Sequence, residues 1–328
     1  MASPHDTSAS RPRILVTRKL PERVQARLIR GYDARLNETD RQYGAEDIIS
    51  GAKDCDGLLV TPTDRITAGL IEALPESVRI IATFSVGYDH IDLQAAARRG
   101  IVVTHTPDVL TDATADIAML LLLGAARGAH WGERMVREGR WGAWAPTHPL
   151  GLDVTGRRLG ILGMGRIGQA VAARARAFGM RIHYHNRRRL ARELEQGARY
   201  HENFAAMLPH CDFLSINCAS TEETRGLINK ETIAALPPGA VIVNTARGDI
   251  VDDDALISAL RSGHVAAAGL DVFNGEPDID PRYRELENVF LLPHLGSATP
   301  DTREAMGMRA ADNLDAFFAG RRPGDALT

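Results

Sequence analysis

The chain has little cysteine, no long apolar run and no strong excess of either charge. Its three cysteines, Cys55, Cys211 and Cys218, are too few and too scattered for a disulfide framework or a zinc cluster, which predicts reduced thiols and no metal site. The longest apolar run, residues 117–126, falls far short of the ~18 residues that span a bilayer. A formal net charge of −3 provides no basic field for nucleic acid. Residues 1–12 are polar and show no secretory signal. We therefore expect a cytoplasmic protein without a membrane or nucleic-acid partner.

Repeats, low-complexity segments and long linkers are also missing. Apolar residues make up 44% of the chain and charged residues 25%, as in ordinary globular proteins. A length of 328 residues suggests two domains, each able to bury its own core.

Short apolar runs alternate with helical patterns along the whole chain. In the first hundred residues we expect strands at 14–16, 57–60, 80–82 and 101–103, and helices at 21–28 and 93–99. A long apolar helix over 112–126 then precedes a second series, with strands at 159–162, 182–185, 213–217, 241–244, 266–270 and 289–292 and a helix over 300–319. Alternation of this kind predicts an α/β fold of two doubly wound parallel-sheet domains, with the active site in the cleft at the carboxyl ends of the strands.

A glycine-rich turn at Gly163, Gly165 and Gly168 predicts a dinucleotide site. The turn follows an expected strand and opens an amphipathic helix, which is the context that the fingerprint requires. Gly163 permits the tight turn, Gly165 lets the backbone approach a pyrophosphate, and Gly168 allows close packing of helix on strand. The free N–H groups at the helix N-terminus then face the phosphates.

The carboxylate that usually ends the next strand of an NAD site is missing. Asn186 takes its place and is followed by Arg187, Arg188 and Arg189. A carboxylate would repel a 2′-phosphate, whereas asparagine and arginine can bind it through charge-assisted hydrogen bonds. A solvated basic turn is the alternative. The pattern favours NADP(H), with NAD(H) possible.

Three polar residues each follow a separate apolar strand in the second series. Arg247 can bind a carboxylate and a neighbouring keto oxygen with paired hydrogen bonds, although an exposed ion-paired arginine fits the pattern equally well. His294 can donate a proton near neutrality if the carboxylate of Glu276 lies beside it, because the carboxylate favours the imidazolium. Together the three supply what hydride transfer to a 2-keto acid requires.

These segments together resemble the D-isomer-specific 2-hydroxyacid dehydrogenases. Besides the glycine turn, the matching stretches are residues 85–92, 245–248, 269–277 and 293–299. The resemblance runs from about residue 13 to residue 320, and within the family it is greatest to the glyoxylate/hydroxypyruvate reductases. It implies a Rossmann domain, residues 107–295, inserted into a flavodoxin-like substrate-binding domain formed by residues 1–106 and 296–328.

The same resemblance implies a role for individual residues. Arg247, Glu276 and His294 are the expected catalytic residues, with His294 as the general acid and Glu276 as its partner. The expected substrate contacts are the backbone N–H groups of Val86 and Gly87 and the side chains of Arg247, His294, Ser297 and Trp144. The expected coenzyme contacts are Thr114, Gly163, Gly165, Arg166, Ile167, Gly168, Asn186, Arg187, Arg188, Cys218, Ala219, Thr245, Ala246, Asp271, His294 and Gly296.

Residues 130–150 form a long segment without an expected strand, and they carry Trp131, Trp141 and Trp144. Large apolar side chains on such an arm bury more readily against a second subunit than in water. We therefore expect a homodimer formed mainly through the nucleotide-binding domains. In the relatives that the chain resembles, a tryptophan on this arm enters the partner's active site; Trp144 either does so or only packs at the dimer interface.

Related activities remain open at this stage. A 2-ketogluconate reductase of the same family would use the same residues for a longer substrate. Phosphoglycerate and D-lactate dehydrogenases would be expected to carry an acid near Asn186, and formate dehydrogenases lack the partner that Glu276 provides. A nucleotide-sensing binding protein related to the dehydrogenase-like corepressors is a remote alternative, because a fold alone does not determine function. The sequence favours NADPH-dependent reduction of glyoxylate or hydroxypyruvate.

Overall fold

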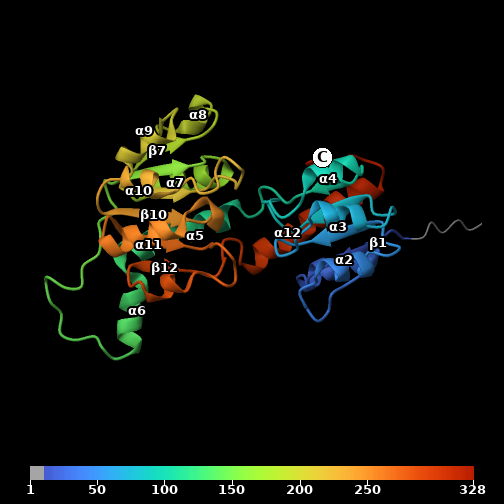
Figure 1. The fold of residues 1–328 in the computed structure, drawn as a ribbon, viewed down its shortest axis with the longest axis horizontal. Coiled ribbons are helices and arrows are strands. Elements are labelled where there is room, and N and C mark those ends of the chain that lie inside the picture. Colours follow the sequence, from blue (N-terminus) through green and yellow to red (C-terminus); the bar gives the residue numbers. More distant parts are fainter. Residues whose placement is uncertain (1–10) are drawn as a thin grey trace, which may run out of the picture. The chain divides into compact units, whose positions relative to one another are not determined.

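The computed structural model describes residues 11–328, which divide into two compact α/β units (Figure 1). Most of the polar segment 1–12, for which the sequence predicts no secretory signal, lies outside the described residues. The first unit contains the chain up to Leu110 together with Thr299–Thr328, and the second contains Thr111–Ala298. All strand pairings within the two sheets are parallel, which confirms the predicted fold class. No helix within residues 11–328 combines the length and the apolar character needed to cross a membrane.

The first unit is built on a five-stranded sheet with the order β2-β1-β3-β4-β5, the order of flavodoxin-like folds. Its strands are β1 (Arg13–Val16), β2 (Asp33–Arg35), β3 (Gly57–Val60), β4 (Ile80–Thr83) and β5 (Val102–Thr104). Its helices are α1 (Glu22–Gly31), α2 (Ala45–Gly51), α3 (Ala68–Ala73), α4 (Leu93–Arg98) and α12 (Pro300–Phe318). The C-terminal helix α12 packs on α1 and β4, so the chain ends in the unit where it began.

The second unit is built on a seven-stranded sheet with the order β12-β11-β10-β9-β6-β7-β8. Its strands are β6 (Arg158–Leu162), β7 (Arg181–His185), β8 (Arg199–Tyr200), β9 (Phe213–Ile216), β10 (Ala240–Asn244), β11 (Val265–Leu270) and β12 (Val289–Leu291). The order reverses between β6 and β9. A parallel sheet binds its ligand at such a switch point, beyond the carboxyl ends of the strands.

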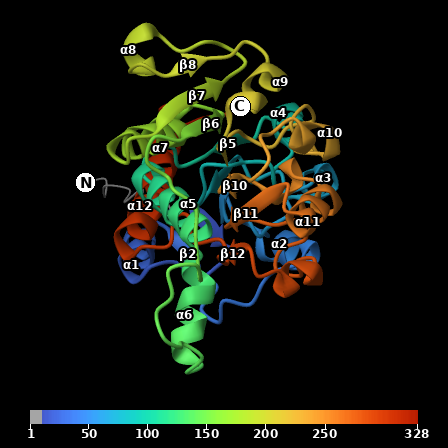
Figure 2. The ribbon, with the colours of Figure 1, turned by 90° about the vertical axis from the view of Figure 1, so that its left-hand side faces the viewer.

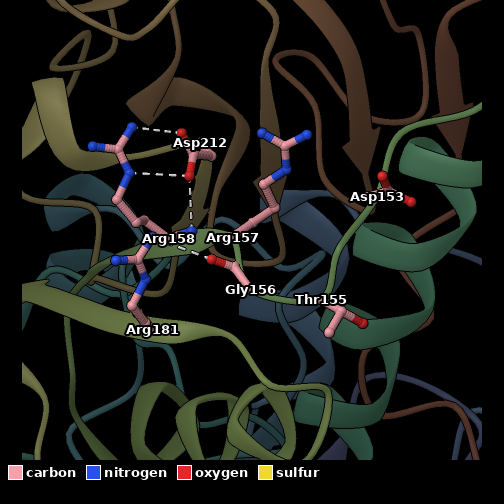
Figure 3. A pocket seen from close by; sticks show the side chains of 7 residues that line it. All are labelled: Asp153, Thr155, Gly156, Arg157, Arg158, Arg181 and Asp212. Atoms are coloured by element: carbon pink, nitrogen blue, oxygen red, sulfur yellow. Dashed lines mark hydrogen bonds and ion pairs between the residues drawn. The ribbon is translucent and has the colours of Figure 1, made fainter.

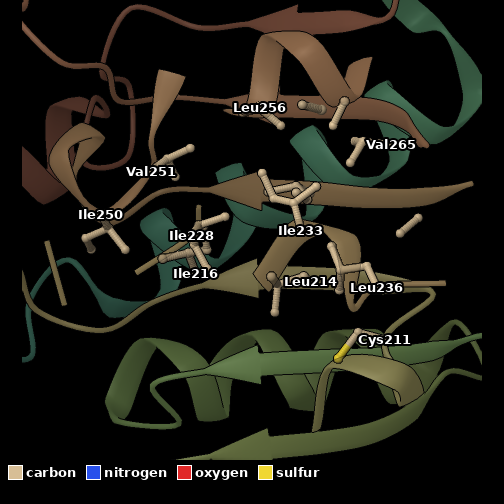
Figure 4. Packing of buried hydrophobic residues seen from close by; sticks show 14 of the residues in the cluster. Cys211, Leu214, Ile216, Ile228, Ile233, Leu236, Ile250, Val251, Leu256 and Val265 are labelled. Atoms are coloured by element: carbon tan, nitrogen blue, oxygen red, sulfur yellow. The ribbon is translucent and has the colours of Figure 1, made fainter. Parts of the chain in front are cut away.

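Helices cover both faces of this sheet. The helices of this unit are α5 (Thr111–Arg127), α6 (Ala129–Arg137), α7 (Arg166–Ala177), α8 (Arg192–Glu195), α9 (Phe204–Met207), α10 (Lys230–Ala234) and α11 (Asp253–Ser262), with 3-10 turns η1 (Leu208–His210), η2 (Gly248–Ile250) and η3 (Pro281–Glu285); α6 projects from the sheet. The apolar helix α5 packs with α7 on one face. The other face buries a second cluster, which Figure 4 shows around Leu214, Ile233 and Leu256.

The sequence located α5 and all but one of this unit's strands closely, but it did not predict several of its helices. The predicted helix over 112–126 is α5, and the predicted strands coincide with β6, β7 and β9 to β12 within one residue at each end. The two-residue strand β8 and the helices α6, α8, α9, α10 and α11 were not predicted. Both ribbon views show α6 and the loop that follows it projecting away from the sheet (Figures 1 and 2).

Candidate active site

The three predicted catalytic residues all follow strands at the carboxyl edge of the second unit's sheet. Arg247 lies three residues after β10, Glu276 follows β11, and His294 follows β12. These strands are neighbours in the order β12-β11-β10. Parallel strands end at the same edge of a sheet. The fold therefore brings Arg247, Glu276 and His294 to one edge, although Arg247 and His294 are 47 positions apart in the sequence.

His294 and Glu276 form a direct hydrogen-bonded pair. The Nδ1 of His294 lies 2.8 Å from Oε2 of Glu276. The other carboxylate oxygen, Oε1, accepts the backbone N–H of Phe273 at 2.7 Å, which fixes the orientation of the carboxylate. The imidazole is 43% exposed, and within the described residues its Nε2 has no hydrogen-bond partner. The ring therefore presents one nitrogen to Glu276 and the other to a ligand.

Asp271 holds the backbone of the His294 loop. His294 has a φ of 56°, which is unusual for a residue other than glycine. Its N–H donates to the carbonyl of Asp271 at 2.9 Å. The Asp271 carboxylate accepts the N–H of Leu295 at 2.6 Å and that of Gly296 at 2.8 Å. Asp271 is only 1% exposed. This network compensates for the unfavourable φ of His294, because strained backbone persists only where its surroundings determine it.

Arg247 leaves β10 in extended conformation, supported by the buried side chain of Asn244. Asn244 donates from Nδ2 to the carbonyl of Arg247 at 2.8 Å and accepts the N–H of Ala246 at 2.9 Å. The guanidinium donates from Nη1 to the carbonyl of Ala246 at 2.7 Å. Asn244 was not predicted, although a polar residue at the end of an apolar strand could have indicated it.

The charges of Arg247 and His294 act on Glu276. Burial raises the pKa of the Glu276 carboxyl, but the hydrogen bond and charge of His294, the N–H of Phe273 and the charge of Arg247 lower it more, so that the net pKa lies below its usual value. Glu276 therefore stays ionised near neutral pH and accepts the hydrogen bond from Nδ1 of the imidazole.

Replacing Glu276 with glutamine should consequently change the pH dependence of reduction. The glutamine side chain is close in shape to glutamate and can still accept a hydrogen bond, but it carries no charge to favour the imidazolium. We expect the pH above which kcat for reduction declines to move downward. The measurement is kcat from pH 5.5 to 9 at saturating substrate. Identical pH profiles for the two proteins would show that Glu276 does not control the acid.

The glycine-rich turn has the geometry that its sequence predicts. Gly163 has a φ of 91°, and a Cβ there would lie 2.5 Å from the backbone nitrogen of Cys218, so only glycine fits. A Cβ on Gly168 would collide with the carbonyl of Gly163, whereas Gly165 faces open space. Helix α7 begins directly after Gly165, and no side chain caps its N-terminus. Its first N–H groups are thus available to an anion.

Asn186 follows β7 and reaches across to the glycine turn. Its Oδ1 accepts the N–H of Met164 at 2.6 Å. Arg187 and Arg188 are exposed, and within residues 11–328 neither forms an ion pair. Arg189 differs, because its guanidinium pairs with Glu195 at 2.7 Å, and Glu195 also accepts the hydroxyl of Tyr184. The third arginine of the run is therefore structural, and the first two remain available to a phosphate.

Two buried polar atoms at the same edge lack partners within the described residues. They are Oγ1 of Thr245, just after β10, and Oδ1 of Asn217, just after β9. An unsatisfied buried polar group is costly, and it indicates a site where a ligand or water completes the bonding. The residues present thus fit a dinucleotide lying along the carboxyl edge. Thr245 was among the predicted contacts; Asn217 was not, and only its place after an apolar strand could have indicated it.

The remaining predicted coenzyme contacts line the loops of this edge. Thr114, near the start of α5, donates its hydroxyl to the carbonyl of Gly296 at 3.1 Å and so supports the His294 loop. Cys218 and Ala219 follow β9 and flank the glycine turn. Burial raises the pKa of the Cys218 thiol to about 11, so it stays protonated. Ala246 is buried beside Arg247.

Val86 and Gly87 belong to the first unit, in the loop that follows β4. The carbonyl of Val86 lies 2.9 Å from Nδ1 of His105, and the carbonyl of Gly87 accepts the hydroxyl of Ser85 at 2.6 Å. Within residues 11–328 their two N–H groups donate no hydrogen bond. Both are available to an anion, as the prediction for these residues requires.

A hollow also exists at the opposite, amino edge of the second sheet (Figure 3). It lies where β6, β7 and β9 begin, far along the strands from the glycine turn. Arg158 at its centre is paired to both carboxylate oxygens of Asp212, at 2.6 and 3.0 Å, which ties β6 to the residue before β9. The hydrogen bonds from Arg158 lower the pKa of Asp212 despite partial burial. We assign this hollow no part in the chemistry.

Comparison with known proteins identifies the family. Residues 119–296 match the family model described as the D-isomer specific 2-hydroxyacid dehydrogenase, NAD binding domain. A glyoxylate reductase of Korarchaeum cryptofilum is 46% identical over 95% of each chain. A glycerate dehydrogenase of Hyphomicrobium methylovorum is 44% identical over 95% of this chain and 97% of its own. The chain belongs to the D-isomer specific 2-hydroxyacid dehydrogenase family.

A solved structure of a relative has the same fold as this chain. The NADPH-dependent glyoxylate/hydroxypyruvate reductase of Sinorhizobium meliloti, in complex with NADP and malonate, has a TM-score of 0.88 and 39% identity, with 97% of each chain covered. The predicted family and enzyme class are confirmed: the protein is an oxidoreductase with an NAD-binding Rossmann domain.

Proposed function

We propose that this D-2-hydroxyacid dehydrogenase reduces glyoxylate, hydroxypyruvate or both to the corresponding 2-hydroxy acid with NADPH, in the D-configuration where the product is chiral. The observation that carries the proposal is the pairing of His294 with Glu276 at 2.8 Å beside Arg247, at the same sheet edge as the glycine turn. A proton donor, the carboxylate that charges it and an anion-binding arginine are what reduction of a 2-keto acid requires.

Each residue then has a defined task. The nicotinamide coenzyme, when bound, supplies the hydride to the keto carbon. Arg247 binds the substrate carboxylate and draws charge toward the keto oxygen. The N–H groups of Val86 and Gly87, in the first unit, are themselves proposed as carboxylate ligands. His294 donates its Nε2 proton to the oxygen as the alkoxide develops, and Glu276 stays ionised throughout and stabilises the imidazolium. Ser297 belongs to the same loop as His294 and contributes to the substrate pocket.

A substrate panel tests this assignment. We expect NADPH oxidation with glyoxylate and hydroxypyruvate at kcat/KM values well above those with 2-ketogluconate and pyruvate. The similar proteins are named as a glyoxylate reductase and a glycerate dehydrogenase, whose substrates are two- and three-carbon acids, and this supports the expected order. A clear preference for 2-ketogluconate would replace the proposal with a sugar-acid reductase that uses the same residues.

Coenzyme preference should depend on Asn186 and Arg187. The proposal is that Arg187 and Arg188 bind the 2′-phosphate through charge-assisted bonds, each contributing about 1.5–3 kcal/mol before solvent weakens it. In the unmodified protein we expect kcat/KM for NADPH to exceed that for NADH by roughly a hundredfold. The double variant Asn186→Asp, Arg187→Ala should shift preference toward NADH. The introduced carboxylate keeps an oxygen for the N–H of Met164, so the glycine turn should survive the change.

Arg189→Ala is the control for this experiment, because Arg189 is paired with Glu195. It should weaken the α8 loop without changing the NADPH/NADH ratio by more than a few-fold. Equal kcat/KM for both coenzymes in the unmodified protein would show that Arg187 and Arg188 do not bind the 2′-phosphate and form only a solvated basic turn.

The arm after α6 supports the proposal of a homodimer. Trp141 is 68% exposed, Trp144 82% and Leu150 71%, so this segment presents large apolar side chains outside the fold of its own chain. We propose that a second subunit covers them, with Trp144 near the partner's substrate site. Sedimentation at micromolar concentration should give the mass of a dimer, and the variant Trp141→Ser, Trp144→Ser should weaken it. A monomer under these conditions would contradict the assembly.

A further inference from the structure

Three histidines pack together at the β7–β8 side of the second unit's sheet, and the proposed chemistry uses none of them. His183 lies in β7, His201 directly follows β8, and His210 ends η1. Their ring centroids are 5.2, 5.3 and 5.5 Å apart in the three pairs. His183 and His201 are each only 8% exposed. Within the described residues no group of such side chains is arranged to hold a metal ion, so a different role is required.

The contact between His183 and His201 restricts their protonation. Nδ1 of His183 and Nε2 of His201 are 2.9 Å apart, so one nitrogen donates and the other must accept through its lone pair. Protonation of both rings would leave two N–H groups facing each other. The packed arrangement therefore requires at least one neutral imidazole.

The surroundings oppose protonation further. Arg199 on β8 is paired in register with His183, and Arg158 on β6 also acts on it, although Asp212 balances the charge of Arg158. Burial, followed by the charges of the neighbouring histidines and these arginines, lowers the pKa of His183 to about 4. Burial also lowers the pKa of His201, with smaller contributions from Arg199, His210 and His185.

This cluster supports the part of the sheet that ends at the expected adenosine site. Strand β8 has only two residues, and just two residue pairs join it to β7. Nδ1 of His185 donates to the carbonyl of His201 at 2.9 Å. The hydroxyl of Tyr200 donates to the carbonyl of Asn186 at 3.4 Å, and Asn186 in turn bonds to Met164 of the glycine turn. The ordering of Asn186 therefore depends on an edge strand whose main-chain pairing is minimal.

We propose that His183 and His201, stacked against His210, form a proton-sensitive latch, which holds the β7–β8 edge closed near neutral pH and releases it in mild acid, weakening coenzyme binding. The effect on the coenzyme rests on the proposed function; the release itself does not. Histidines with a depressed folded-state pKa stabilise the closed form fully above their ordinary pKa of ~6.5. In the open form the histidines regain their ordinary pKa. As pH falls below 6.5, the open form therefore binds more protons than the closed form does. The closed form is progressively destabilised toward pH 4.

The test compares the unmodified full chain with the variant His183→Asn, His201→Gln. Asparagine places an amide near the position of Nδ1 and glutamine near that of Nε2, so a hydrogen bond can persist without a titrating ring. Amide hydrogen exchange, expressed as protection factors, is measured for residues 181–211 at pH 7.5 and 5.5. Binding is measured by calorimetry with NAD⁺, because the 2′-phosphate of NADP itself titrates near pH 6. His264→Gln is the control: His264 is also hydrogen-bonded through Nε2, to the carbonyl of Ile233.

In the unmodified protein and the control we expect protection to fall by about tenfold between pH 7.5 and 5.5. The NAD⁺ dissociation constant should rise as the inverse of the fraction of protein that stays closed. The double variant should change less than threefold. An equal response in all three proteins overturns the latch. If the double variant does not fold, the single variant His201→Gln removes one titrating ring and should show a reduced response; an unreduced one overturns the proposal. Absence of binding of both NAD⁺ and NADPH at pH 7.5 would refute the coenzyme assignment, while the protection factors would still decide the latch.

Discussion

Replacing His294 with alanine should lower kcat for keto-acid reduction by about 10²–10⁴, while the dissociation constant for NADPH changes only a few-fold. A positioned general acid contributes to the rate by roughly this factor. The geometry isolates the effect, because Nδ1 of His294 is bonded to Glu276 and Nε2 has no partner within the described residues. The variant keeps the backbone bonds of the loop, which Asp271 accepts from residues 294, 295 and 296.

The control for this variant is His264→Ala. His264 lies just before β11, at the opposite edge of the same sheet, and its ring bonds to the backbone carbonyl of Ile233. Its removal should leave kcat within a factor of two or so of the unmodified value. If His294→Ala also retains turnover within a few-fold, another group supplies the proton and the assigned role is wrong.

Arg247→Ala should reduce kcat/KM for every 2-keto acid by roughly 30-fold to several thousandfold. Truncating one member of a desolvated charge pair typically costs about 2–5 kcal/mol, and each 1.4 kcal/mol corresponds to a factor of ten. The loss should fall on substrate far more than on coenzyme. Arg247→Lys keeps the charge but cannot form paired hydrogen bonds, so it should retain an intermediate activity.

Arg261→Ala separates loss of the site from a general loss of stability. Arg261 lies near the end of α11 and pairs at 3.5 Å with the exposed Glu285, so its removal should have little effect on either kcat/KM or melting temperature. A melting temperature for Arg247→Ala far below that of the unmodified protein would assign Arg247 a structural role. A variant that lost only NADPH affinity would move it out of the substrate site.

The sequence predicted most of the candidate site because the signals were local. A glycine turn after a strand, and single polar residues after β10, β11 and β12, are visible without knowledge of the fold. Parallel pairing then brings those strand ends together, so the contact between His294 and Glu276 follows from topology that the alternating pattern predicts.

What the sequence did not predict depends on contacts between distant segments. Asp271 was predicted only as a coenzyme contact. Its carboxylate also accepts two N–H groups of the His294 loop, which lie 24 and 25 positions away, and no local pattern indicates such a pairing. Strand β8 is too short to show an alternation. Arg189 looked like Arg187 and Arg188, and only its ion pair with Glu195 distinguishes it. The packing of His183, His201 and His210 likewise joins three separate elements.

The proposed reaction is direct hydride transfer from the nicotinamide to a 2-keto acid, with a D-product from hydroxypyruvate. The most direct measurement uses hydroxypyruvate with NADPH deuterated at C4, each of the two diastereomers in turn, followed by mass spectrometry and chiral analysis of the glycerate. We predict D-glycerate that carries deuterium at C2 from one diastereomer and none from the other. L-glycerate, or product without deuterium from either diastereomer, would contradict the account.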